Sequence, residues 1–354
     1  MPIASGSVVE LPTSPNRARR PSLPYARRGL AWAGLVVSGV FAYLAVRHVK
    51  FADVSDALRS SNYWWLLPGL ALLAVCVLLK AIRWRYLFAR ETRPPLPAVA
   101  GALLVGYFFN NVLPARAGEA ARVVALNRST RTPRAEVVAT VALDRAYDVA
   151  SLLVLLFVGL PWFPHVSWLR AAAVLAIVLT GGLVVGAVVL ARYGERPLRV
   201  VLRPLRRLRL VDDARVELAA ANLANGLAAL RRPRLVLAAL VWTTAAWLAL
   251  AVSCWTVMLG FDFHHPFGAA LLVVIAINLA AILPSSPAAV GVFEQATLVA
   301  LGAYGVSDSA ELPYALVLHV ANVIPFVVVG LVVLHRQALR PSRAGAMRRA
   351  EPPA

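Results

Sequence analysis

Cysteine and acidic residues are scarce in this sequence of 354 residues. Its two cysteines each lie inside a long apolar run, where a free thiol behaves as a small hydrophobic group, so we expect neither a disulfide nor a metal site. The chain also lacks a nucleotide-binding loop, metal-ligand spacing and a nucleophile–base pair. These absences argue against an enzyme and predict no cofactor.

Hydrophobic residues, in contrast, make up 60% of the chain, against roughly half in a soluble domain. Several apolar runs reach the roughly 18–20 residues that cross a bilayer. The sequence therefore predicts an all-α polytopic membrane protein. The net charge of +19 comes largely from Arg residues at the ends of these runs, which indicates positive-inside topology and contact with anionic headgroups. No motif for binding nucleic acid is present.

The loop charges give one consistent topology with a membrane domain over residues 29–336. Six full spans are predicted near 29–46, 63–82, 136–160, 168–190, 235–259 and 312–334. The first run is long for a signal peptide and no clear cleavage site follows it, which favours an uncleaved anchor. Four arginines after the second span are interpreted as its cytoplasmic flank: Arg83, Arg85, Arg90 and Arg93.

Three segments outside the spans are predicted to be cytoplasmic. Residues 1–28 form a disordered basic tail, and residues 337–354 form the second tail. The basic loop at 192–234 either lies partly on the anionic leaflet as interfacial helix or is a solvated linker. Both termini are thus expected in the cytoplasm, at the cytoplasmic membrane.

A break interrupts the apolar run that begins near residue 98. It contains helix-breaking and polar residues: Asn110, Asn111, Pro114, Arg116, Gly118, Glu119 and Arg122. Broken backbone at membrane depth survives only inside protein or beside a watery cavity, because each unsatisfied group costs several kcal/mol in hydrocarbon. Ionisable residues there are usually functional. Basic residues flank the segment on both sides, which predicts a re-entrant hairpin near 98–127 that opens to the cytoplasm.

A second break follows the apolar run that begins near residue 267. It contains Pro284, Pro287, Gly291 and Glu294. Neither flank is basic, so this hairpin, near 267–303, is expected to open from outside. Two broken hairpins of opposite orientation indicate an inverted repeat with a transport site between them. The alternative is a chance likeness between two proline-kinked helices.

The predicted third span carries three charges, Asp144, Arg145 and Asp148. On an insertion scale they cost on the order of 9 kcal/mol, so the helix needs partners. Arg145 and Asp148, three residues apart, are expected to pair. Asp144 and Asp148 share one face and repel unless a cation faces them; Arg116 or Arg122 is suited to this role.

The candidate substrate-binding residues come from both breaks, the third span and the last span: Asn110, Asn111, Arg116, Glu119, Arg122, Asp144, Arg145, Asp148, Glu294 and His319. Arg116 offers a two-pronged fork for phosphate. Glu119 and Glu294 have three open roles: binding a cationic substrate group, carrying protons, or neutralising the arginines. His319 lies inside the last span.

The run N-N-V-L-P-A-R-A-G-E-A-A-R resembles the lysylphosphatidylglycerol synthase transmembrane-region family of flippase-like proteins. The run L-P-S-S-P-A-A-V-G-V-F-E is similar to the family's second motif, and the likeness covers roughly Gly29 to Arg336. Four positions depart from the family pattern. Ala288-Ala289 stand in place of a glycine pair, Asp144 stands where Glu is commoner, and His319 replaces a basic residue.

The resemblance implies a flippase without a synthase. Family members with a C-terminal soluble domain attach lysine to phosphatidylglycerol and flip the product, and we expect no such domain in this chain. Three functions are open. The first is translocation of an anionic or zwitterionic lipid, such as a phospholipid or polyprenyl phosphate, without ATP. The second is a non-transporting membrane partner that recruits a lipid-modifying synthase or glycosyltransferase through 192–234. The third is a lipid-modifying enzyme with Asp144, Asp148 or His319 as acid or base. The sequence gives no oligomeric state.

Overall fold

The computed structural model describes residues 51–89, 92–113, 117–164, 233–281, 286–306 and 308–339, with a few isolated positions between 36 and 193. The predicted spans at 29–46 and 168–190 are described only at such positions. The two tails, nearly all of the loop at 192–234, and Pro114, Arg116 and Pro284 lie outside the described residues.

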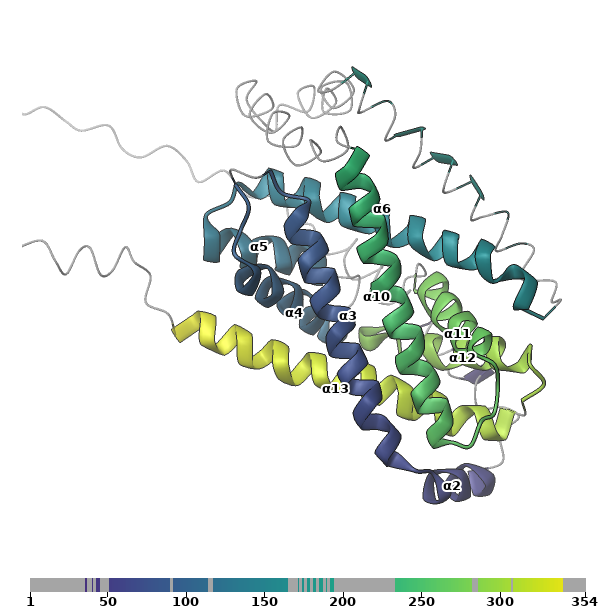
Figure 1. Ribbon diagram of the computed structural model, residues 1–354. Helices are drawn as coiled ribbons and strands as arrows, with labels where there is room; N and C mark the ends of the chain where they lie inside the picture. Colours follow the sequence, from purple (N-terminus) through teal and green to yellow (C-terminus); the bar gives the residue numbers. More distant parts are fainter. Residues whose placement is uncertain are drawn as a thin grey trace, which may run out of the picture.

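Every regular element in the described segments is helical, as an all-α membrane protein requires (Figure 1). The first half contains α2 (Phe51–Ser60), η1 (Tyr63–Trp65), α3 (Leu66–Tyr86), α4 (Leu96–Val112), α5 (Gly118–Thr130), α6 (Arg134–Gly159) and η2 (Leu160–Trp162). The second half contains α10 (Pro233–Gly260), α11 (Phe267–Ala280), η4 (Pro287–Ala289), α12 (Val292–Gly302) and α13 (Asp308–Leu339).

Three helical stretches in the described residues are long and apolar enough to cross a membrane, with mean hydropathy between 2.2 and 2.5. They are Tyr63–Tyr86, Arg234–Gly260 and Glu311–Gln337, which correspond to the spans predicted near 63–82, 235–259 and 312–334. Helix α6 matches the span predicted near 136–160 in position and has 26 residues. Its buried residues include three carboxylates: Glu136, Asp144 and Asp148.

Helices α3 and α10 form an antiparallel pair at the centre of Figure 1. Asn62 donates its backbone N–H to the carbonyl of Gly260 at 2.8 Å, where α10 ends and η1 begins. About two turns further along the pair, Ser253 Oγ donates to the carbonyl of Gly69 at 2.7 Å. A Cβ on Gly69 would lie 3.1 Å from Thr256 Oγ1, so the small residue permits this close approach.

The first predicted break is a helical hairpin in which α5 folds back on α4. Helix α4 ends at Val112, Leu113 is extended, and α5 begins at Gly118. Asn110 Oδ1 accepts a hydrogen bond of 2.9 Å from the backbone N–H of Gly118, which satisfies a donor at the start of α5. A Cβ on Gly118 would lie 1.9 Å from the carbonyl oxygen of Gly106, so only glycine fits this crossing.

The second predicted break separates α11 from α12 and contains η4. Ala288 and Ala289 have φ of 56° and 58°, in the left-handed region, and Gly291 has φ of 82°. Glycine adopts such angles readily, whereas alanine is strained there. The chain thus places alanine at both positions where the family pattern has a glycine pair.

The two hairpins meet in the interior of the protein. They flank the α3–α10 pair in Figure 1, and α13 passes across both. Helix α13 packs against α4 and α12, and η4 contacts α4. Tyr107 of α4 and Phe326 of α13 have ring centroids 4.8 Å apart. Each hairpin also contributes to its own hydrophobic cluster, one formed with α3 and the first half of α6 and one with α10 and the second half of α6.

Candidate functional site

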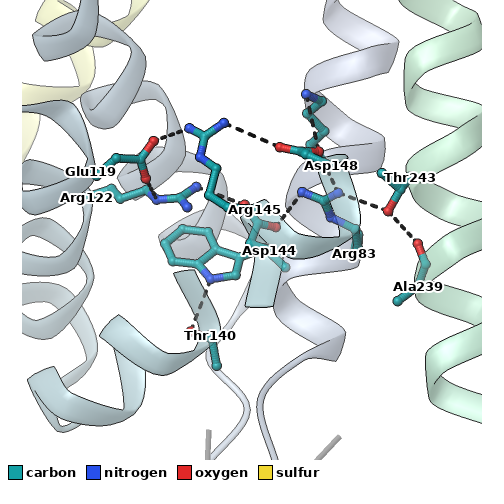
Figure 2. A network of polar contacts seen from close by, with 11 residues as sticks. Arg83, Glu119, Arg122, Thr140, Asp144, Arg145, Asp148, Ala239 and Thr243 are labelled. Atoms are coloured by element: carbon teal, nitrogen blue, oxygen red, sulfur yellow. Dashed lines mark hydrogen bonds and ion pairs between the residues drawn. The ribbon is translucent and has the colours of Figure 1, made fainter. Parts of the chain in front are cut away.

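Asp144 and Asp148, one turn apart on α6, face Arg83 of α3 (Figure 2). Arg83 Nη2 donates to Asp144 Oδ1 at 2.5 Å, and Nη1 donates to Asp148 Oδ1 at 2.8 Å. Nη1 also donates to Thr243 Oγ1 of α10 at 2.9 Å. The expected cation between the two carboxylates is present, but it is Arg83. This residue is only 1% exposed, although the sequence placed it in a cytoplasmic flank.

Arg122, at the start of α5, approaches the same carboxylates from the first hairpin. Its Nη1 donates to Asp144 Oδ2 at 3.0 Å, and its Nε lies 2.9 Å from Glu119 Oε2. The guanidinium lies over the indole ring of Trp84, 4.8 Å from the ring centroid. Trp84 is held in turn by a hydrogen bond from its Nε1 to Thr140 Oγ1. Of the two α6 carboxylates that Arg122 was predicted to face, the structure pairs it with Asp144.

Arg145 connects the hairpin to α6 on the more exposed side of the cluster (Figure 2). It pairs with Glu119 and, through Nη1, with Asp148 Oδ2 at 3.4 Å. The predicted pair between Arg145 and Asp148 is therefore confirmed. Of the three roles open to Glu119, the structure displays charge neutralisation, because Glu119 contacts two guanidinium groups.

Lys80 completes the cluster from α3, one turn before Arg83. Its Nζ lies 3.7 Å from Asp148 Oδ1 and 3.8 Å from the ring centroid of Trp247 on α10. Sequence reasoning missed Lys80 as well as Arg83. Their spacing in the sequence could have identified them. Lys80 and Arg83 are three residues apart, so both side chains lie on one face of α3.

The cluster has one positive charge in excess within the described residues. Its members are four cations and three carboxylates: Lys80, Arg83, Arg122, Arg145, Glu119, Asp144 and Asp148. Each buried ion carries a desolvation cost of several kcal/mol, which a close partner of opposite sign offsets. An excess cation in such a place favours the arrival of an anion.

A cavity of about 200 Å³ lies beside Lys80, where the two hairpins meet. Its walls come from α3, α4, α10, α11, α12 and α13, and include Lys80, Tyr107, Trp247, Asn278, Phe293 and Asn322. Both cysteines, Cys76 and Cys254, also line it and are free thiols. Of the proposed substrate-binding residues that the structure describes, none lines this cavity.

Glu294 and His319 form a second polar site at the second hairpin. Glu294 Oε1 lies 2.6 Å from His319 Nδ1, and Oε2 accepts the backbone N–H of Gly291 at 2.7 Å. His319 Nε2 lies 2.8 Å from the carbonyl oxygen of Ala288, so Nε2 carries a proton that it donates there. The ring of Phe293 stacks on His319 at 4.3 Å. The two predicted residues are thus brought together, on elements different from those of the Arg83 cluster.

The remaining predicted residues shape the two breaks. Asn110 caps α5, and Asn111 Nδ2 donates to the carbonyl of Tyr107 within α4 at 3.1 Å. Gly118 and Gly291 are the first residue of α5 and the residue before α12. Pro287 opens η4. These residues hold the backbone at the breaks.

The breaks, the cluster and the cavity fall within one matched segment. The family model for the lysylphosphatidylglycerol synthase TM region matches residues 31–330. The chain belongs to this family. Among curated proteins, none matches the sequence. Family membership together with three apolar helices makes the chain a membrane protein related to lipid handling.

Proposed function

We propose that this chain translocates a lipid with an anionic or zwitterionic headgroup between the leaflets of the cytoplasmic membrane. The observation that carries the proposal is the buried cluster around Arg83, in which four cations face three carboxylates beside a helix break. Ionisable residues at membrane depth are costly, and they commonly mark the path of a substrate or ion.

The chemistry of the cluster suits a phosphate-containing headgroup. Arginine binds phosphate through two parallel N–H donors, and the excess positive charge compensates the anion during its passage. Arg145 is the most exposed of the four cations, with 40% of its side chain accessible, so it offers a first contact. The acyl chains would stay in the surrounding lipid throughout.

The two hairpins supply the moving parts in this proposal. Paired broken helices at a repeat interface are typical of transporters, in which one bundle rocks against the other. The contact between η4 and α4 gives the two hairpins a shared boundary. We propose that both hairpins are re-entrant, the first from the cytoplasm and the second from outside, and that both termini are cytoplasmic. The proposal assigns no chemical reaction to the chain.

Lipid exchange in liposomes tests the proposal directly. The purified full chain is reconstituted with a fluorescent phosphatidic acid, and a membrane-impermeant quencher reports the label that reaches the outer leaflet. Glu119→Gln removes one carboxylate that binds two arginines, and should slow exchange about tenfold, which corresponds to roughly 1.4 kcal/mol on the barrier. Asp262→Asn is the matched control, because its side chain is 92% exposed. The Asp262→Asn variant should exchange lipid at the same rate as the unaltered chain.

Two results would count against a translocator. Folded protein that exchanges no labelled lipid would favour the recruiting partner, which depends on the loop at 192–234. If Glu119→Gln exchanges lipid at the same rate as the unaltered chain, transport does not depend on the cluster. A synthase or glycosyltransferase partner would then be sought by co-purification with the full chain, and a chain that lacks this loop should fail to retain it.

A further inference from the structure

The cavity beside Lys80 has a single charged group in its wall. Among the described residues that line it, Lys80 is the only one with a full charge at neutral pH, and no carboxylate lines it. The rest of the wall is aromatic or aliphatic, apart from Tyr107, the two thiols and two asparagines. A cationic ligand would be repelled by the ammonium group, whereas an anion gains an ion pair in a poorly solvated place.

Lys80 contacts Asp148 and the ring of Trp247, and its ammonium group can still take a further partner. Its Nζ is 3.7 Å from Asp148, beyond hydrogen-bond distance, and Asp148 already pairs with Arg83 and Arg145 at shorter range. Asp148 therefore stays neutralised if Lys80 turns away. The ammonium group has three donors on a flexible four-carbon stem, so it can move a short way into the cavity.

Two asparagines add acceptors to the wall of the same cavity. Asn278 Nδ2 donates to the carbonyl of Val274, and Asn322 Nδ2 donates to that of Leu318, both at 2.8 Å. These bonds to their own helices fix each amide and leave its Oδ1 for a ligand hydroxyl. The amides come from α11 and α13, so a ligand between them and Lys80 would contact both halves of the chain.

The volume limits the size of the ligand. Pockets for drug-sized molecules measure roughly 300–1,000 Å³, and this cavity holds about 200 Å³. A phosphate with a small substituent fits this space. An oligosaccharide on a diphosphate carrier does not.

We propose that this cavity binds the phosphate of a compact lipid headgroup with net negative charge, with Lys80 as the phosphate-binding residue and Asn278 and Asn322 as acceptors for headgroup hydroxyls. The inference rests on the proposed function and narrows its substrate from anionic or zwitterionic lipids to anionic ones.

The two cysteines provide a direct probe of occupancy. The chain has two cysteines, and both Cys76 and Cys254 line the cavity, so every alkylation event reports on it. The purified full chain in detergent is treated with N-ethylmaleimide, and intact mass gives the alkylation rate. Phosphatidic acid should slow alkylation severalfold, whereas phosphatidylcholine and diacylglycerol with the same acyl chains should leave the rate unchanged.

Variants of Lys80 connect protection to the ammonium group. Lys80→Met removes the charge at similar size and should abolish protection by phosphatidic acid, and Lys80→Arg should keep it. Arg336→Met, at an exposed position on α13, is the matched loss of charge and should also keep it. Because Lys80 itself affects thiol reactivity, each variant is compared with and without lipid. Inorganic phosphate separates the two sources of the anion: protection by it shows that phosphate alone suffices, and protection by the lipid alone shows that acyl chains add to binding.

Three results would overturn the inference: equal protection by phosphatidylcholine, protection that persists in Lys80→Met, or no protection by phosphatidic acid or phosphate. The lipid comparison in the unaltered chain remains decisive if Lys80→Met fails to fold. The outcome is also separable from that of the exchange experiment. Exchange without protection would keep the translocator and reject this cavity, and protection without exchange would keep the cavity as a lipid site and reject the translocator.

Discussion

Arg83 on α3 and Asp144 on α6 form a buried ion pair, with 2.5 Å between Arg83 Nη2 and Asp144 Oδ1 and both side chains no more than 4% exposed. The same guanidinium holds Asp148 and Thr243, so one side chain ties α3 to α6 and α10. It lies where the first hairpin joins the rest of the helices. The folding of the charged helix α6 therefore depends on a residue that lies far away in the sequence.

Replacing Arg83 should destabilise the protein strongly. Arg83→Met leaves two buried carboxylates with one cation fewer, and should lower the free energy of unfolding by about 3–5 kcal/mol. Arg85→Met removes a neighbouring arginine that makes one hydrogen bond to the carbonyl of Pro94, and should cost about 1 kcal/mol. Thermal unfolding in detergent compares the two. The double variant Arg83→Met/Asp148→Asn should recover part of the lost stability. Equal losses of stability in Arg83→Met and Arg85→Met would contradict this account.

The sequence was sufficient to predict where the helices break and which α6 charges need partners. Asp144 and Asp148 lie four residues apart in an apolar helix, so a facing cation was required by electrostatics alone. Arg122 was named for this role and pairs with Asp144. Arg83, which holds both carboxylates, was missed because it lies two residues before Arg85 in a run that the positive-inside rule explains equally well. Helix periodicity reports which residues share a face, but not which distant helix covers it.

The second hairpin shows the same limit. Glu294 and His319 were both candidates, yet nothing in the sequence joined two residues on different helices. The departure from the family's glycine pair was visible, but only the backbone angles reveal that Ala288 and Ala289 occupy left-handed positions. The cavity was not predicted, since its wall combines six helices.

Glycine at those two alanine positions should stabilise the protein. An alanine in the left-handed region costs roughly 1–2 kcal/mol, and replacing it with glycine removes this strain. Glycine also loses more chain entropy on folding, which offsets about 0.5–1 kcal/mol of that gain. Ala288→Gly/Ala289→Gly should therefore raise the free energy of unfolding by about 1 kcal/mol. Ala281→Gly, at a position with φ of −64°, is the control and should lower it. A loss in the double variant similar to that in the control would show that strain at η4 is not significant.

Gly118 should tolerate no side chain. Its added Cβ would meet the carbonyl oxygen of Gly106 at 1.9 Å, so Gly118→Ala must push α5 away from α4. Overpacking typically costs about 1–3 kcal/mol, and we expect the free energy of unfolding to fall by an amount near the upper end of this range. The yield of folded protein should also be lower. Gly302→Ala is the matched control, because its Cβ would make an ordinary contact at 3.7 Å with Glu311. Equal thermal stability of the two variants would refute the close crossing.

Glu294 and His319 should be energetically coupled. A double-mutant cycle with Glu294→Gln and His319→Gln should give a coupling energy of about 1.5–3 kcal/mol, as for a buried hydrogen bond to a charged group. The chain has its own reference pair in His264 and Asp262, which lie 3.6 Å apart with both side chains more than 80% exposed. That pair should couple by about 1 kcal/mol or less. Additive effects at Glu294 and His319 would mean that their contact contributes nothing to stability.

Arg122 should not be replaceable by lysine. Its guanidinium contacts Asp144 through Nη1 and Glu119 through Nε while its plane lies over Trp84, and one ammonium group cannot reproduce this geometry. Arg122→Lys keeps the charge, so a change in lipid exchange reports the fork geometry and not the net charge. We expect exchange to fall about tenfold, which corresponds to roughly 1.4 kcal/mol. Arg128→Lys, on the exposed end of the same helix, should leave exchange unchanged. Full activity in Arg122→Lys would show that the cluster acts only through its charge, and phosphate recognition would then be assigned to Lys80 and the cavity alone.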